Sequence, residues 1–139
     1  LTPSAATSMK RYDLMQAVCA RGTFMLTVKC LPHLRRSQYP RVLMISPPLS
    51  MASKWFGPHV AYTTAKYGMS MCVLGMAEEY RGDGVAVNAL WPRTLIATDA
   101  LKAIAGTSSG AEEMGRQGRT AEIMADAAFH VLSEPPSFT

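Results

Sequence analysis

The sequence predicts an α/β fold, a doubly wound parallel sheet with helices on both faces. Segments with helical periodicity alternate along the chain with short, continuously apolar segments. That alternation is typical of parallel strands joined by helical crossovers. The apolar segments lack polar residues at alternate positions, which indicates strands that are buried on both faces.

The first part of the chain predicts a long helix, a strand and a loop. Residues 9–34 carry apolar side chains at helical spacing, and Thr7 or Ser8 stands where a helix N-cap is expected. Residues 42–45, all apolar, predict a short buried strand. Prolines end this strand and open a loop over 47–58.

The second part repeats the alternation. The expected elements are a helix over 60–81 that Gly82-Asp83-Gly84 stops, a strand over 85–90, a short helix over 98–105, a loop over 106–118 and a helix over 120–132. Two strands are too few for an independent sheet of this type. The sequence therefore predicts that residues 1–139 are half of one larger doubly wound domain.

Composition excludes several classes of function. The hydrophobic fraction of 48% and charged fraction of 17% are those of a soluble globular protein, and no apolar run is long enough to span a membrane. The net charge of +4 comes from scattered basic residues, so nucleic-acid binding is not expected. Three cysteines without paired spacing and three scattered histidines predict neither disulfides nor a metal site. We expect a cytoplasmic, reducing location.

Tyr62 and Lys66 are the candidate catalytic pair. They lie one helical turn apart, so both side chains are expected on one face of the helix. A phenol has an ordinary pKa of about 10, and a nearby ammonium lowers it. The phenol of Tyr62 could then donate or accept a proton. Taken alone the spacing is a weak signal, because such pairs are usually surface pairs.

The flanking strands strengthen the signal. Ser46 ends the strand before the pair, and Trp91-Pro92 ends the strand after it. Ligands of open α/β sheets bind at the carboxyl ends of the strands. We therefore expect Ser46 or Ser50, Tyr62 and the loop after Pro92 to converge on one crevice.

These residues resemble a known family. Ala61-Tyr62-Thr63-Thr64-Ala65-Lys66 and Val87-Asn88-Ala89-Leu90-Trp91-Pro92 look like the C-terminal half of a short-chain dehydrogenase/reductase. Ile45-Ser46-Pro47-Pro48-Leu49 and Trp55-Phe56 resemble its hydroxysteroid dehydrogenase-like subgroup. The resemblance implies that residues 1–139 are the C-terminal catalytic half of one Rossmann-like domain whose N-terminal βαβ half is missing. It also implies an enzyme that uses NADP or NAD to interconvert a small-molecule carbonyl and an alcohol.

The resemblance also implies roles for individual residues. Tyr62 would be the catalytic acid/base, and Lys66 would lower its pKa and bind the nicotinamide ribose. Pro92, Thr94, Ile96 and Thr98 would lie along the nicotinamide and its phosphates. A serine would polarise the substrate carbonyl: Ser46 fits by its place after the strand and Ser50 by its distance from Tyr62, while either could instead be a turn serine.

The sequence departs from the family pattern in three ways. Cys19 stands where many members have an asparagine that holds a water in the proton relay, and a thiol is a poor replacement. Arg93 stands where a glycine is common, either beside the cofactor phosphates or simply exposed. The Gly-rich turn that binds a dinucleotide pyrophosphate is absent, so these 139 residues alone are expected to be inactive.

The apolar faces of the long helices predict a second role. In the family, the helices that match 9–34 and 60–81 pack against those of another subunit, which implies a homodimer or homotetramer. The alternative function is therefore a catalytically inactive, truncated dehydrogenase that acts as a dimerisation or interaction module. Family resemblance also admits a peroxisomal or mitochondrial location.

Overall fold

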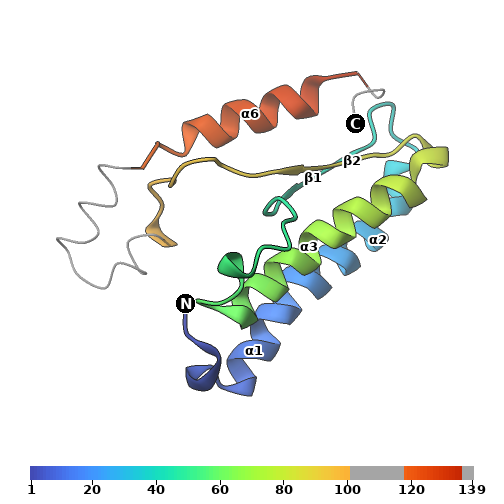
Figure 1. The fold of residues 1–139 in the computed structure, drawn as a ribbon. Coiled ribbons are helices and arrows are strands. Elements are labelled where there is room, and N and C mark those ends of the chain that lie inside the picture. Colours follow the sequence, from blue (N-terminus) through green and yellow to red (C-terminus); the bar gives the residue numbers. More distant parts are fainter. Residues whose placement is uncertain (101–117, 136–139) are drawn as a thin grey trace. The chain divides into compact units, whose positions relative to one another are not determined.

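The computed structural model describes residues 1–100 and 118–135 (Figure 1). The chain divides into two compact units. The first comprises Leu1–Leu90 with Glu134–Thr139, and the second comprises Trp91–Ser133. Tyr62, Lys66 and both candidate serines belong to the first unit, whereas the segment from Pro92 to Thr98 belongs to the second.

The helix expected over 9–34 is present but has a wide turn in its middle. It begins as α1 (Met9–Gln16), passes through five π-helical residues, Ala17–Arg21, and continues as α2 (Gly22–Leu34). Ser8 is the N-cap, because its hydroxyl accepts a hydrogen bond from the Arg11 amide at 3.4 Å. π-helical turns of this kind are often found at functional sites.

The two expected strands pair in parallel. β1 (Arg41–Ile45) and β2 (Ala86–Leu90) run in register from Arg41 opposite Ala86 to Ile45 opposite Leu90. The crossover between them contains α3 (Val60–Glu79). Gly84 then adopts a left-handed φ of 69°, which a glycine accepts without strain, and the chain turns into β2.

One core joins these elements. α3 lies alongside the continuous helix that α1 and α2 form (Figure 1). The buried apolar side chains at its centre come from α2, α3, β2 and the turn before β2: Leu31, Val73, Met76, Tyr80, Val85 and Val87. Val42 and Met44 of β1 pack against this cluster together with Ala89 of β2. Because residues two apart in a strand share a face, these contacts place α2 and α3 over the same face of the sheet.

The second unit contains α6 (Glu122–Ser133), which confirms the helix expected over 120–132 to within two residues. Ile96 forms a parallel bridge with Arg119. Two main-chain hydrogen bonds make this bridge, from the Ala97 amide to the Arg119 carbonyl and from the Arg119 amide to the Leu95 carbonyl, both 2.8 Å. Most of the helix expected over 98–105 and nearly all of the loop expected over 106–118 lie outside the described residues.

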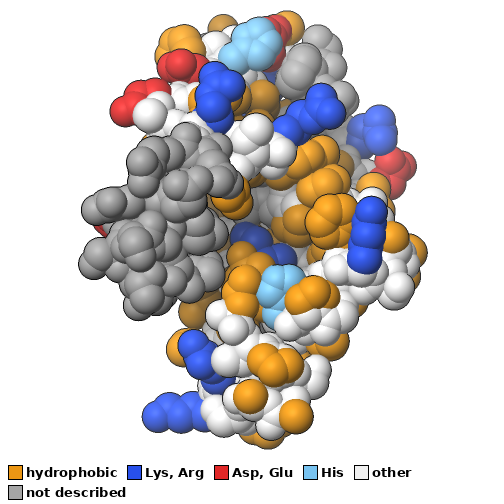
Figure 2. Space-filling view, turned by 60° about the vertical axis from the view of Figure 1, so that its left-hand side comes forward, with side chains coloured by type: hydrophobic (Ala, Val, Ile, Leu, Met, Phe, Trp, Pro, Cys, Tyr) orange, Lys and Arg blue, Asp and Glu red, His pale blue; other side chains and the backbone are white. Residues whose placement is uncertain are grey.

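The surface carries many exposed apolar side chains. On the face drawn in Figure 2 they lie between separate lysines and arginines. In the described part of the chain no helix is both long and apolar enough to cross a membrane. Across residues 1–100 and 118–135, no group of three or more His, Cys, Asp or Glu side chains could hold a metal ion. The three cysteines are free and half-buried.

Candidate active site

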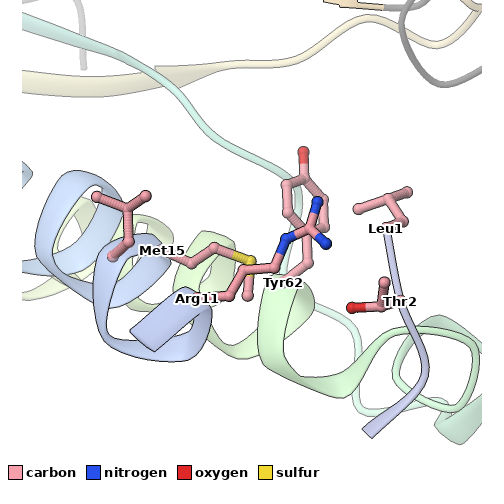
Figure 3. A pocket seen from close by; sticks show the side chains of 6 residues that line it. Leu1, Thr2, Arg11, Met15 and Tyr62 are labelled. Atoms are coloured by element: carbon pink, nitrogen blue, oxygen red, sulfur yellow. The ribbon is translucent and has the colours of Figure 1, made fainter. Parts of the chain in front are cut away.

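Tyr62 lies in the first turn of α3, at the edge of a hollow of about 240 Å³. The hollow is lined by Leu1, Thr2, Arg11, Leu14, Met15 and Tyr62. Tyr62 is 38% exposed, and Figure 3 shows its hydroxyl pointing away from the helix. That hydroxyl has no hydrogen-bond partner among the described residues. It is therefore a proton donor that is free to meet a ligand.

Two groups stand near the Tyr62 phenol. The His59 ring is tilted by 41° to the Tyr62 ring, with the ring centroids 5.9 Å apart. Burial raises the pKa of Tyr62 above its ordinary value, and the charge of a Cys19 thiolate raises it further. Cys19 lies on the π-helical turn, at the position where the family resemblance expects the relay residue.

Lys66 is held at the carboxyl end of β1. Its ammonium donates a hydrogen bond to the Ile45 carbonyl at 3.0 Å and contacts the Met69 sulfur at 3.4 Å. An ammonium has three N–H donors, so one stays available for a ligand. The lowering of the Tyr62 pKa expected from Lys66 is absent in this state, and the shift has the opposite direction. Burial is the larger cause of the shift, and the charge of Cys19 adds to it.

The two candidate serines have different surroundings. Ser46 is 1% exposed, and its hydroxyl has no hydrogen-bond partner within residues 1–100 and 118–135. Ser50 is half-buried in the loop, and its hydroxyl accepts a hydrogen bond from the Ala52 amide at 3.4 Å. The Ser50 carbonyl in turn accepts a hydrogen bond from the Tyr67 hydroxyl at 2.9 Å. In this conformation Ser50 is the serine that a ligand can reach.

The residues expected along the cofactor lie in the second unit. Pro92, Thr94 and Thr98 are exposed, and Ile96 is half-buried beside Arg119. Arg93 is exposed as well. This unit and the one that contains Tyr62 and the two serines are separate. The expected convergence of the loop after Pro92 with Tyr62 and a serine on one crevice therefore stays a prediction.

Two residues beside Tyr62 were not predicted from the sequence. Arg11 of α1 lines the same hollow as Tyr62, and Figure 3 shows their side chains next to one another. No short-range pattern links them, because they are far apart in the sequence. His59 stands three residues before Tyr62, a spacing that could have indicated the ring contact.

Comparison with known proteins decides the family. Residues 2–139 match the family model described as Enoyl-(Acyl carrier protein) reductase. The chain is also similar to a solved short chain dehydrogenase from Mycobacterium thermoresistibile, with a TM-score of 0.85 and 39% identity over 100% of this chain and 48% of that one. The chain belongs to the short-chain dehydrogenase/reductase family. The family resemblance and the Rossmann-like fold expected from the sequence are thereby confirmed.

Relatives within the short-chain dehydrogenase/reductase family narrow the comparison. The chain is 52% identical to Hydroxysteroid dehydrogenase-like protein 2 of Danio rerio and 49% identical to that of Homo sapiens, over all 139 residues. A solved structure from Xanthomonas campestris has a TM-score of 0.89 and 47% identity to this chain. The matched region covers 99% of this chain and 48% of the Xanthomonas chain. The chain spans about a third of the length of the curated relatives, 32% for both named here.

Proposed function

We propose that this chain is the catalytic half of an NAD(P)-dependent oxidoreductase that interconverts a carbonyl and an alcohol, with Tyr62 as the acid/base. One observation carries the proposal. The Tyr62 hydroxyl has no hydrogen-bond partner among the residues that the structure describes, Tyr62 lines a hollow, and Lys66 follows it by one helical turn.

The chemistry follows from the state of the phenol. A bound NADPH or NADH would supply the hydride that reduces the carbonyl carbon. Tyr62 gives its proton to the carbonyl oxygen, so that the alcohol forms and a phenolate remains. The phenol of Tyr62 is protonated at neutral pH and can donate its proton, but its raised pKa makes it a weaker acid than an ordinary phenol. In the oxidation direction the phenolate must exist first, and the Lys66 ammonium is the nearby cation on α3 that could stabilise it.

The chain's residues fit half of a dinucleotide site. Lys66 keeps one N–H donor for the nicotinamide ribose, and the exposed Thr94 offers a hydroxyl. The Gly-rich turn that would bind the pyrophosphate is not in this sequence. NADP and NAD are both retained as candidates, because the residue that selects between them belongs to that same region.

Ser50 is the proposed partner of Tyr62 in polarising the substrate carbonyl. From the described residues its hydroxyl accepts one long hydrogen bond, and it can still donate one. Ser46, in contrast, is sealed from solvent. Ser46 could act only if the loop after β1 moved.

The test uses the full-length protein with NADPH and NADH and a panel of small ketones. Tyr62→Phe should lower kcat by at least about 100-fold, since general acid catalysis contributes that much or more. Its dinucleotide affinity, followed by nicotinamide fluorescence, should not change. Lys66→Ala should weaken dinucleotide binding as well as turnover. Undiminished turnover by Tyr62→Phe would overturn the proposal.

The second candidate is an interaction module without catalysis. Large apolar side chains on the helices are exposed, among them Val18, Leu26, Met71 and Leu74. A face of this kind fits the matching face of a second copy, in a homodimer or homotetramer. A folded oligomer that binds neither dinucleotide would favour this second function over the first.

A further inference from the structure

Three side chains of α3 hold the loop after β1 by its main-chain carbonyls. The Thr63 hydroxyl donates to the Trp55 carbonyl at 2.9 Å, and the Tyr67 hydroxyl donates to the Ser50 carbonyl at 2.9 Å. The Ser70 hydroxyl donates to the Pro47 carbonyl at 2.6 Å. The three donors are spaced by four and then three residues, so they form one row along the helix.

This row is a built feature of the helix. All three side chains are buried, although polar side chains on a helix usually face water. A buried hydroxyl is costly unless it is hydrogen-bonded, so each needs its carbonyl partner. The Tyr67 ring is fixed in addition by the Phe56 ring, with centroids 4.9 Å apart.

The loop needs such an anchor because it has little structure of its own. Between β1 and α3 the chain forms only a short 3-10 turn, Ser53–Trp55. Pro47 and Pro48 have no amide hydrogen, so the strand ladder cannot continue through them. The bonds from α3 therefore supply what regular secondary structure would otherwise provide.

We propose that Thr63, Tyr67 and Ser70 are positioning residues that fix the loop over 46–55 as one rigid wall of the substrate site. The inference rests on the proposed function, because it assigns the loop's Ser50 a place beside the substrate. The acid/base Tyr62 directly precedes Thr63 on the same helix. The same helix therefore carries the proton donor Tyr62 and the three side chains that hold the loop. We infer that this keeps Ser50 at a fixed distance from Tyr62.

The three hydrogen bonds from Thr63, Tyr67 and Ser70 to the loop should affect which substrates bind. With the loop fixed, Ser50 is held in one position for the ketone. When a bond of the row is lost, the loop samples other positions and Ser50 is presented for only part of the time. Substrate binding should then weaken while dinucleotide binding, which uses Lys66, is preserved.

The first test measures the loop directly in the full-length protein. Tyr67→Phe and Ser70→Ala each delete one bond, and amide hydrogen exchange over 52–57 should quicken roughly 5-fold in each variant, as the loss of one net hydrogen bond implies. Trp55 fluorescence, read in a Trp91→Phe background, should become more accessible to acrylamide. Tyr80→Phe, the same substitution within the core cluster, is the matched control and should change neither reading. Unchanged exchange and quenching in Tyr67→Phe and Ser70→Ala would overturn the proposal.

The second test separates positioning from general loss of fold. With cyclohexanone as the probe ketone and NADPH, Tyr67→Phe should raise KM about 5-fold with a smaller change in kcat. The NADPH dissociation constant and exchange in the 72–79 segment of α3 should stay the same. A fall in kcat alone would contradict the positioning role. If Tyr62→Phe proved harmless, the proposed function would fail while the exchange measurement still decided whether the row anchors the loop.

Discussion

The Lys66 ammonium donates a 3.0 Å hydrogen bond to the main-chain carbonyl of Ile45. This bond ties α3 to the end of β1, the place where ligands of open α/β sheets bind. Lys66 is thus a structural residue in the state described here as well as a candidate for cofactor binding. The two roles can be separated because only one of them needs a positive charge.

The substitutions Lys66→Gln and Lys66→Met separate the structural role of Lys66 from its role in cofactor binding. The glutamine keeps an N–H donor for the Ile45 carbonyl, whereas methionine keeps only the length of the side chain. We expect Lys66→Met to lower the free energy of unfolding by about 1 kcal/mol and Lys66→Gln to lower it less. Both should lose dinucleotide affinity, because neither carries the charge. Urea unfolding and nicotinamide fluorescence measure the two effects, and equal destabilisation by both variants would contradict the structural role.

The pKa of Tyr62 should respond to Cys19. A thiolate near the phenol disfavours the phenolate, so Cys19→Ala should lower the pKa of Tyr62 toward its ordinary value. Ultraviolet absorbance titration of the phenol measures this, with Tyr62→Phe as the reference that identifies the signal. A Tyr62 titration that does not move in Cys19→Ala would show that burial alone causes the shift.

The same raised pKa makes stability depend on pH. The folded state holds the Tyr62 proton more tightly than the unfolded state, in which the pKa is about 10. The resulting stabilisation is complete below that value and is lost as the pH rises through the higher pKa of the folded state. Tyr62→Phe should therefore flatten the fall of stability on the alkaline side in urea unfolding. If stability fell with rising pH as steeply in Tyr62→Phe as in the unsubstituted protein, Tyr62 would not be the cause of the fall.

Substitution of the two serines decides between them. Ser46→Ala removes a buried hydroxyl that has no partner in the described part of the chain, so stability should stay the same or rise slightly. Ser50→Ala should leave the fold intact, because its carbonyl is the atom that Tyr67 holds, and should lower kcat for a probe ketone. Steady-state kinetics and thermal unfolding of the two variants provide the comparison. Loss of turnover in Ser46→Ala alone would reverse the assignment.

The sequence predicted the fold well because its signals are local. The helical spacing over 9–34, the prolines after Ile45 and the turn at Gly84 each act on neighbouring residues. The π-helical turn over Ala17–Arg21 could not be predicted, because it accompanies a long-range contact. The direction of the Tyr62 pKa shift was missed for the same reason, since burial and the position of Cys19 depend on how α1 and α3 pack.

Oligomer formation should depend on the exposed apolar side chain of Leu74. It lies on α3 and is 65% exposed, so a charge there costs the monomer little. If this helix packs against a second copy, Leu74→Glu should bury an unpaired charge and shift the protein to monomers. Light scattering after gel filtration measures the mass. Glu78→Gln is the control on the same helix, because that side chain is exposed and already faces Arg81.

Two glycines of α3 make a matched pair for packing. A Cβ at Gly68 would lie 2.7 Å from the Ala20 Cβ, closer than two carbon atoms can approach, whereas a Cβ at Gly75 would meet nothing within 4 Å. Gly68→Ala should therefore destabilise the protein by about 1–3 kcal/mol through overpacking. Gly75→Ala should stabilise it by roughly 0.5–1 kcal/mol, because alanine is the better helix former.

The cause of the Gly68 effect can be checked by relief of the clash. Ala20→Gly removes the atom that the new Cβ would meet, so the double variant should recover part of the lost stability. Ala20 belongs to the same π-helical turn as Cys19, so a shift of this turn should also change the titration of Tyr62. Urea unfolding and absorbance titration of the single and double variants test both. Strictly additive losses would mean that the two positions do not pack together.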